Sequence, residues 1–244
     1  GMSPCLKNCA KVRIVPLVAP VPSRVIVNSV PGLLAAVRAV KPTVLIGGPA
    51  SGGARFSREV LAELCSNNNT GGNGRHHRPI ILALSNDSAG GRGEVSAQDA
   101  YEWTGGAALF ADRSRPGSAE AAALSRAGGA LTLSDGSKRT PSRLHTAYLY
   151  PGLGHGAVAS RSTRLRDEAV LAAAEAISDE VSDAELAAGA LLPPLASLRA
   201  VAARVACAAA RRHYELGVAT ELPRPPDLGA HLRKTAYEPS YRKY

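Results

Sequence analysis

Two uniformly apolar stretches mark the first half of the chain. Residues 43–46 (Thr-Val-Leu-Ile) and 80–84 (Ile-Ile-Leu-Ala-Leu) do not alternate between apolar and polar positions. Such runs are typical of buried strands covered on both faces, as in a parallel sheet between helices. A glycine-rich or polar segment follows each run, and a helical pattern follows each of those segments. The pattern therefore predicts repeated strand–loop–helix units.

The stretch 78–101 contains the clearest of these units. The strand at 80–84 ends in Ser85-Asn86, and the glycine-rich turn 90–93 comes next. Ser96, three residues before Asp99, then predicts a capped helix start, because its hydroxyl can accept a free backbone N–H. Since ligands of open α/β sheets bind outside the carboxyl ends of the strands, Ser85 and Asn86 are candidate binding residues.

The rest of the first half is divided by similar signals. Residues 1–31 carry five prolines, which restricts any strand there to a sheet edge. The further elements predicted are helices at 32–40, 57–65 and 118–126, and strands at 107–111 and 130–133, the last before a turn at Asp135-Gly136.

The final third is helical. Val170, Ala174, Ile177 and Val181 recur at helical spacing and predict one buried face. The remaining signals are a capping box from Ser182 with an end near Gly189, a long helix at about 197–216 and a last short helix capped by Asp227. The order favours an α/β fold, a partial doubly wound (Rossmann-like) parallel sheet with a helical C-terminal extension. We expect an irregular segment at 1–31, a partial NAD(P)-binding α/β domain at 32–160 and the extension at 161–244.

Two glycine-rich segments allow two interpretations each. The loop 47–53 after the first strand lacks both the P-loop and the G-x-G-x-x-G spacing. Gly47 and Gly48 are candidates for a cofactor loop, and a plain strand-to-helix turn explains them equally well. Gly152, Gly154 and Gly156 follow Pro151 before a helix. They permit backbone contact with a ligand, and tight helix–sheet packing accounts for them equally well.

Composition narrows the class of partner. The 244 residues carry a formal net charge of +9, but aromatic residues make up 4% and offer no stacking platform for single strands. A solvated basic surface is therefore favoured over nucleic-acid binding.

No apolar run reaches the length of a membrane span. The four cysteines do not form a zinc signature, and reduced thiols fit a cytoplasmic protein, with the mitochondrion as the alternative.

Several separate segments resemble the malic enzyme family, in the same order along the chain. The similarity extends over roughly residues 32–244 and corresponds to the later part of the family's NAD(P)-binding domain and its terminal helices. The segments that carry it are 41–47, 78–86, 100–104, 147–152, 214–217 and 237–241.

The resemblance implies NAD- or NADP-dependent oxidative decarboxylation of malate to pyruvate and CO2, with Mg²⁺ or Mn²⁺. In the family a metal polarises the keto acid and a lysine and a tyrosine transfer protons. The family's metal-binding carboxylates, lysine–tyrosine pair and G-x-G-x-x-G turn belong to a part that this sequence does not match. The sequence therefore predicts no catalytic residue and no metal ligand in this chain.

The resemblance assigns two residues to the substrate and the nicotinamide. Asn86 occupies the position of a family asparagine that contacts both, although Asp87 replaces the proline that normally follows. A second family site has two adjacent asparagines, and here these are His145 and Thr146. His145 can still donate a hydrogen bond to a carboxylate, but the amide geometry is lost.

Three functions remain open at this point. The first is a malic-enzyme-like protein or fragment that acts with malate or pyruvate in a longer chain, in a complementing subunit or in a homo-oligomer, and is inactive alone. The second is a degenerate, non-catalytic paralogue that serves as a binding or assembly module. A basic nucleic-acid-binding domain ranks below both.

Overall fold

The computed structural model describes residues 32–48, 56–69, 78–84, 94–113 and 129–237. Its main sheet in this part is parallel, with the strand order β1-β2-β3-β6. The strands are β1 (Val44–Gly47), β2 (Ile80–Ala83), β3 (Leu109–Asp112) and β6 (Ser142–Arg143). Strand and helix alternate along the sheet, which confirms the predicted α/β class. The predicted segment 1–31 and helix 118–126 lie outside the described residues.

Three helices cover one face of this sheet. They are α2 (Leu33–Val40), α3 (Arg58–Asn69) and α4 (Ala97–Trp103). Each successive strand is added on the same side of the previous one, so right-handed crossovers place α3 and α4 on the same face, and α2, which precedes β1, packs against α3. The core between the layers includes Leu45, Ile81 and Phe110 from the sheet and Leu61 and Tyr101 from the helices.

The opposite face of the sheet corrects the expectation that the apolar strands are covered on both sides. Ile81 is fully buried, whereas Ile80 and Leu82, which point the other way, are half-buried. Ile46 in β1 is 59% exposed. The strands are apolar, as predicted. The described elements cover their residues more completely on one face of the sheet than on the other.

Strands β4 (Leu131–Thr132) and β5 (Lys138–Arg139) form a separate antiparallel pair. The predicted turn joins them, with the Ser137 N–H donating to Asp135 Oδ1 at 2.8 Å and Gly136 at φ 80°. The strand predicted at 130–133 is thus confirmed in a shorter form. Its partner β5 and the fourth strand of the main sheet, β6, were not predicted.

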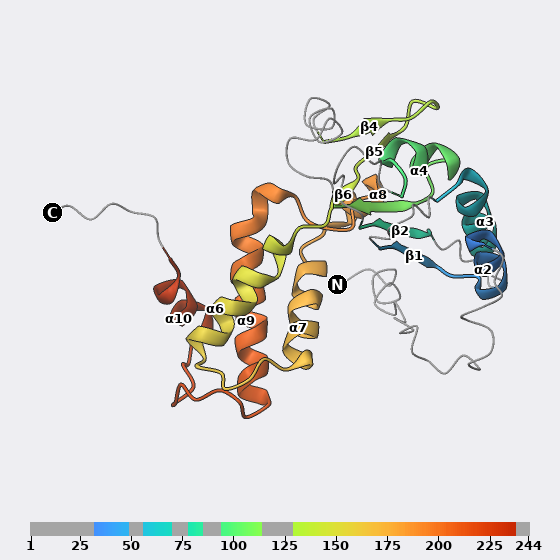
Figure 1. Ribbon diagram of the computed structural model, residues 1–244. Coiled ribbons are helices and arrows are strands. Elements are labelled where there is room, and N and C mark those ends of the chain that lie inside the picture. The colour runs from blue at the N-terminus through green and yellow to red at the C-terminus, as the bar shows by residue number, and fades with distance from the viewer. Residues whose placement is uncertain (1–31, 49–55, 70–77, 85–93, 114–128, 238–244) are drawn as a thin grey trace, which may run out of the picture.

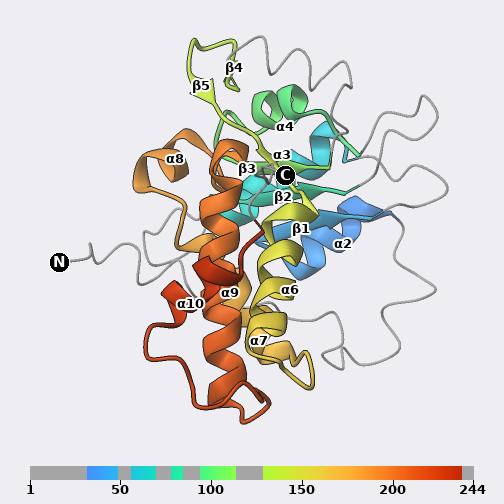
Figure 2. The same cartoon turned by 90° about the vertical axis from the view of Figure 1, so that its left-hand side faces the viewer.

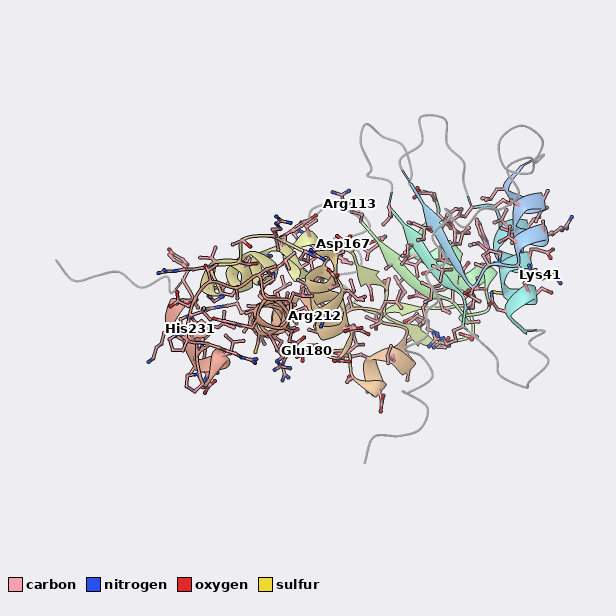
Figure 3. All side chains as sticks on the ribbon, turned by 90° about the horizontal axis from the view of Figure 1, so that it is seen from below. Lys41, Arg113, Asp167, Glu180, Arg212 and His231 are labelled. Atoms are coloured by element: carbon pink, nitrogen blue, oxygen red, sulfur yellow. The ribbon has the colours of Figure 1, made fainter. Side chains whose placement is uncertain are left out.

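The second half of the chain is a helical bundle centred on α9 (Leu198–Glu215), which contacts α6 (Tyr150–Ala159), α7 (Asp167–Ser178) and α10 (Leu228–Thr235). Figure 2 shows α6 and α9 side by side, with α10 next to them. Figure 1 shows the bundle on the opposite side of the sheet from α2 and α3. Figure 3 agrees, with Lys41 after α2 and His231 on α10 near opposite ends of the described fold. The short elements between are η1 (Thr146–Tyr148), α8 (Asp183–Ala188) and η2 (Leu195–Ser197).

Local capping signals in this half are confirmed. The Glu185 N–H donates to Ser182 Oγ at 3.3 Å, and the Ser182 N–H donates to the Glu185 carboxylate at 2.7 Å. Gly189 ends α8 at φ 101°, and Asp227 accepts the Ala230 N–H at the start of α10. The predicted buried face of α7 is confirmed at Ile177 and Val181 but wrong by one position earlier in the helix, where Ala169 and Ala173 are buried and Val170 is 36% exposed.

The three glycines of α6 also differ from the sequence-based picture. They lie inside the helix rather than before it, and the helix packs on α9 rather than on the sheet. A Cβ at Gly152 would stand 2.5 Å from the Ala202 carbonyl oxygen, and one at Gly156 would stand 2.6 Å from that of Ala206. A Cβ at Gly154 would meet nothing within 4 Å. Close packing therefore accounts for Gly152 and Gly156.

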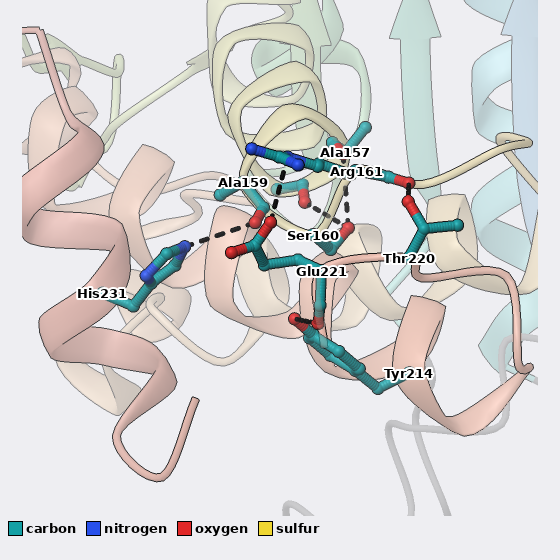
Figure 4. A network of polar contacts seen from close by, with 9 residues as sticks. Ala157, Ala159, Ser160, Arg161, Tyr214, Thr220, Glu221 and His231 are labelled. Carbon is teal, nitrogen blue, oxygen red and sulfur yellow. Dashed lines mark hydrogen bonds and ion pairs between the residues drawn. The ribbon is translucent and has the colours of Figure 1, made fainter. Parts of the chain in front are cut away.

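A polar network fixes the end of α6 to the segments around α9 and α10 (Figure 4). Arg161 Nε pairs with the Glu221 carboxylate at 2.9 Å, and Thr220 Oγ1 donates to the Arg161 carbonyl at 2.7 Å. The Tyr214 hydroxyl donates to the Glu221 carbonyl at 2.9 Å. His231 lies 3.3 Å from the carbonyl of Ala159. The segment after α9 is thus held against α6 by several polar contacts.

Candidate functional site

The carboxyl ends of the parallel strands meet at one edge of the sheet. The register aligns Gly47 with Ala83 and Ala83 with Asp112, and pairs Asp112 with Arg143. The ladder continues one residue further, where the Leu84 N–H donates to the Gly47 carbonyl at 3.2 Å. The Leu144 N–H likewise donates to the Asp112 carbonyl at 2.7 Å. Because ligands of open α/β sheets bind at this edge, it is the candidate functional site.

Ser85 and Asn86, the two polar residues predicted to end β2, lie outside the described residues. Leu84 is the last described residue before them, and its hydrogen bond places the end of β2 beside β1. Their assignment to substrate and cofactor stays a prediction.

Gly47 has a packing role at this edge. A Cβ built there would stand 2.5 to 2.7 Å from side-chain atoms of Glu94, so any larger residue would displace that carboxyl group. Gly48 is exposed, and a Cβ there would meet nothing within 4 Å. Of the two glycines proposed for a cofactor loop, Gly47 makes room for Glu94, whereas no packing contact requires a glycine at Gly48.

His145 lies at the same edge, two residues after β6, and its side chain is exposed. The Ala147 N–H donates to His145 Nδ1 at 3.1 Å, which caps the helix η1. Since Nδ1 accepts, the neutral ring carries its proton on Nε2. The cap therefore fixes the ring in the tautomer that can donate a hydrogen bond to an anion.

Two charged residues at this edge were not singled out by the sequence. Glu94 is 6% exposed, and its carbonyl accepts the Phe56 N–H at 3.0 Å, which ties the start of α3 to this loop. The exposed Arg113 follows β3 directly, and its N–H donates to the Ala83 carbonyl at 3.1 Å. The signal for Arg113 was its place just after a predicted strand. No sequence motif points to Glu94.

A metal centre of the kind implied by the resemblance needs several His, Cys, Asp or Glu side chains close together. No group of three or more His, Cys, Asp or Glu side chains that could hold a metal ion occurs among them. The described part of the chain therefore does not fit a metal centre, and no chemical step is derived through one. Within the same part, no helix is long and apolar enough to cross a membrane.

Known proteins with similar sequences identify the family of this chain. Residues 23–214 match the family model of the malic enzyme NAD binding domain. The chain is 39% identical over 216 residues to the NADP-dependent malic enzyme of Populus trichocarpa, covering 88% of this chain and 32% of that protein. It is 38% identical over 213 residues to NADP-dependent malic enzyme 3 of Arabidopsis thaliana, with 87% and 32% covered.

Solved structures agree on the fold. The malic enzyme of Entamoeba histolytica superposes with a TM-score of 0.54 at 16% identity, covering 83% of this chain and 32% of that one. The malic enzyme of Pyrococcus horikoshii gives 0.52 at 18% identity, covering 83% and 35%. The chain spans about a third of the length of the curated relatives it matches. This chain belongs to the malic enzyme family and matches its NAD-binding domain.

Proposed function

We propose that the chain supplies one wall of a malic enzyme active site. It binds NAD or NADP and malate or pyruvate at the carboxyl edge of its sheet, and turnover requires a complementing segment or subunit. The proposal is supported by the family model and by relatives that are NADP-dependent malic enzymes. The share of those relatives that the chain matches, 32%, supports the need for a complement.

The strand order carries this proposal. Doubly wound sheets bind their ligands where the order of strands reverses direction, because the loops on either side diverge there. In the described sheet the order runs in one direction, from β1 to β6, and β1 is its edge. The reversal, and with it the second wall of the crevice, therefore has to come from strands added beside β1.

The chain's own residues would bind and orient the ligands. The Nε2–H group of His145 donates to a substrate carboxylate. The hydrogen bond from the Ala147 N–H to Nδ1 selects the tautomer that allows this. Arg113 adds positive charge at the same edge and attracts the anionic substrate and the phosphates of the dinucleotide. The Asn86 amide bonds to the substrate or the nicotinamide without adding charge. A bound nicotinamide would supply the oxidising chemistry. The residues of this chain would position the substrate and the nicotinamide and attract their negative charges.

Complementation tests the proposal. The chain is mixed with the part of the Populus trichocarpa enzyme that it does not match, and formation of NADH or NADPH from malate and Mn²⁺ is followed by absorbance at the reduced nicotinamide band. We expect no turnover by the chain alone and turnover by the mixture. Turnover by the chain alone would refute the need for a complement.

Two matched substitutions locate the interface. Ile46→Lys places a charge on the open face of edge strand β1, where Ile46 is 59% exposed, and Val40→Lys places the same charge on a 73% exposed apolar position at the end of α2. Charges on edge strands oppose pairing with another strand. We expect Ile46→Lys to abolish complementation and Val40→Lys to preserve it. Equal activity of the two variants would contradict the assembly at β1.

One observation favours the second function, a binding or assembly module. The Nδ1 atom of His145 is committed to capping η1, so the residue offers one ring nitrogen where an amide pair would offer more groups. Dinucleotide binding by the chain, measured by calorimetry, together with no turnover in any mixture, would support this alternative over the enzymatic one.

A further inference from the structure

Positive charge gathers at the amino edge of the same sheet, away from the candidate site. Arg78 stands two residues before β2, and Arg139 lies in β5. Neither guanidinium takes part in an ion pair with any described residue. Burial and the neighbouring charge of Arg139 both lower the pKa of Arg78. Two like charges are therefore held close together, and the described part of the chain provides no carboxylate to pair with them.

A third hydrogen-bond donor, the hydroxyl group of Tyr101, lies beside the two guanidiniums. The Tyr101 side chain of α4 is fully buried, and its hydroxyl has no hydrogen-bond partner among the described residues. Burial raises the pKa of this phenol, so it stays protonated and can donate. Guanidinium N–H groups are donors without acceptor capacity. All three side chains are therefore hydrogen-bond donors, and none of them has a carboxylate partner among the described residues.

Gly189, at the end of α8, shows that these groups surround one point. The ideal position of a Cβ on Gly189 lies 3.6 Å from Arg78 Nη2, from the Tyr101 hydroxyl oxygen and from Arg139 Cδ. Gly189 has a φ of 101°, as expected for a glycine that ends a helix. Because it has no side chain, Gly189 places no side-chain atom between Arg78 Nη2 and the Tyr101 hydroxyl.

The guanidiniums also have a structural role that uses part of their capacity. They donate to backbone carbonyls of the segment between α4 and β3, of β5 and of α8. Arg78 donates to Ala107, Ala108 and Leu186, and Arg139 donates to Gly106 and Lys138. Each guanidinium has five N–H groups, so both keep N–H groups for another acceptor.

We propose that Arg78, Arg139 and Tyr101 form a binding site for a small oxyanion, a carboxylate or a phosphate group. Such a group accepts hydrogen bonds from both guanidiniums and from the phenol, and its negative charge offsets theirs. The site lies at the opposite edge of the strands from the candidate active site. It is distinct from the proposed function and does not rest on it.

Binding of inorganic phosphate and of succinate to the full 244-residue chain tests the site. Each anion is titrated by calorimetry, and thermal unfolding is recorded in parallel at constant ionic strength. Arg139→Gln removes one guanidinium, and Tyr101→Phe removes one hydroxyl without changing the charge. Arg199→Gln, in the exposed first turn of α9, removes the same charge elsewhere and is the matched control.

We expect Arg139→Gln and Tyr101→Phe each to raise the dissociation constant by a factor on the order of ten or more, as for loss of a hydrogen bond to a charged group. Arg199→Gln should leave it unchanged. Tyr101→Phe should also raise the melting temperature of the anion-free protein, because it removes a buried hydroxyl that lacks a partner.

The two anions distinguish the source of the oxyanion. Binding of succinate alone indicates a carboxylate ligand, and binding of phosphate alone indicates a phosphorylated one. Binding of both indicates a site that reads only the shared oxyanion chemistry. Equal affinities of all three variants and the unsubstituted chain would overturn the proposal, as would no heat of binding from either anion at tens of millimolar.

Discussion

Three alternate glycines in α6 allow a test of helix packing within a single helix. Gly152 and Gly156 face α9, where a Cβ would stand 2.5 and 2.6 Å from backbone carbonyl oxygens. Gly154 faces open space. Substituting each by alanine adds the same methyl group to the same helix, so the three variants differ in what that methyl group meets.

The expected magnitudes follow from two opposing terms. Alanine stabilises a helix relative to glycine by about 0.5–1 kcal/mol. Overpacking costs about 1–3 kcal/mol, and backbone oxygens cannot avoid the methyl group unless the helices move apart. Gly152→Ala and Gly156→Ala should therefore each lower the free energy of unfolding by about 0.5–2 kcal/mol. Gly154→Ala should raise it by about 0.5–1 kcal/mol.

Urea unfolding followed by circular dichroism measures these differences, with the slope m checked for each variant. One kcal/mol corresponds to about 2–4 °C in melting temperature for a chain of this size, which gives a second readout. The packing argument would be refuted if Gly154→Ala destabilised the protein as much as Gly156→Ala. It would also be refuted if Gly152→Ala and Gly156→Ala were both neutral or stabilising.

Two further predictions concern buried polar groups. Ser142 Oγ accepts the N–H groups of Leu191 and Leu192 at 2.6 and 3.1 Å, so Ser142→Ala should cost about 1–3 kcal/mol in urea unfolding, whereas Ser142→Thr keeps the acceptor and should cost less. Burial lowers the pKa of His213, so the unfolded state binds its proton first as the pH falls through the unfolded pKa near 6.5. Stability should therefore decrease from about pH 7.5 to about pH 5.5, and His213→Gln should reduce this slope, which urea midpoints at the two pH values measure. An unchanged slope in His213→Gln would contradict the role of this residue.

The tautomer of His213 supports that pH prediction. Ser160 Oγ donates to the Gly156 carbonyl at 2.8 Å, so His213 Nδ1, 3.0 Å away, is the donor to Ser160. Its Nε2 is then a buried acceptor without a partner among the described residues. Protonation at Nε2 would create an unpaired buried charge, which is costly. The pKa of His155 is also lowered, by burial and by His231, so removal of His213 alone leaves part of the slope.

The features that sequence predicted best are local. Ser96, Ser182 and Asp227 were predicted to cap helices, and each accepts the expected backbone N–H. A cap depends on residues three positions apart, so its signal lies within a few residues of sequence. The same locality explains the correct position of α9.

The features that sequence missed depend on distant contacts. Strand β6 has two residues, Ser142 and Arg143, and no apolar run; its pairing with Ala111 and Asp112 of β3 defines it. The first half of the buried face of α7 is formed by alanines, so the larger Val170 was predicted to be buried there in place of Ala169, whereas Ile177 was predicted correctly. Small side chains carry little periodic signal, and the partner helix decides which face is buried.

The candidate site was predictable in position and less so in detail. Strand ends in a parallel sheet meet at one edge, so the place of Gly48 follows from the strand predicted at 43–46, whereas β6, which positions His145, was not predicted. The packing of Glu94 against Gly47 joins residues far apart in sequence. The hydrogen bond from the Ala147 N–H that fixes the His145 ring has no sequence motif. These contacts decide which groups remain for a ligand, and they require coordinates.

The exposed face of the sheet links sequence and function most directly. Residues 80–84 have the apolar composition of a strand covered on both sides, yet the described helices cover one side, and Ile46 is 59% exposed. Burying an isoleucine fully is worth about 1.5–3 kcal/mol, so covering Ile46 alone would contribute on the order of 1–2 kcal/mol to an association. Ile80 and Leu82 would add to this. We propose that the complementing segment covers this face of the sheet and adds its strands beside β1.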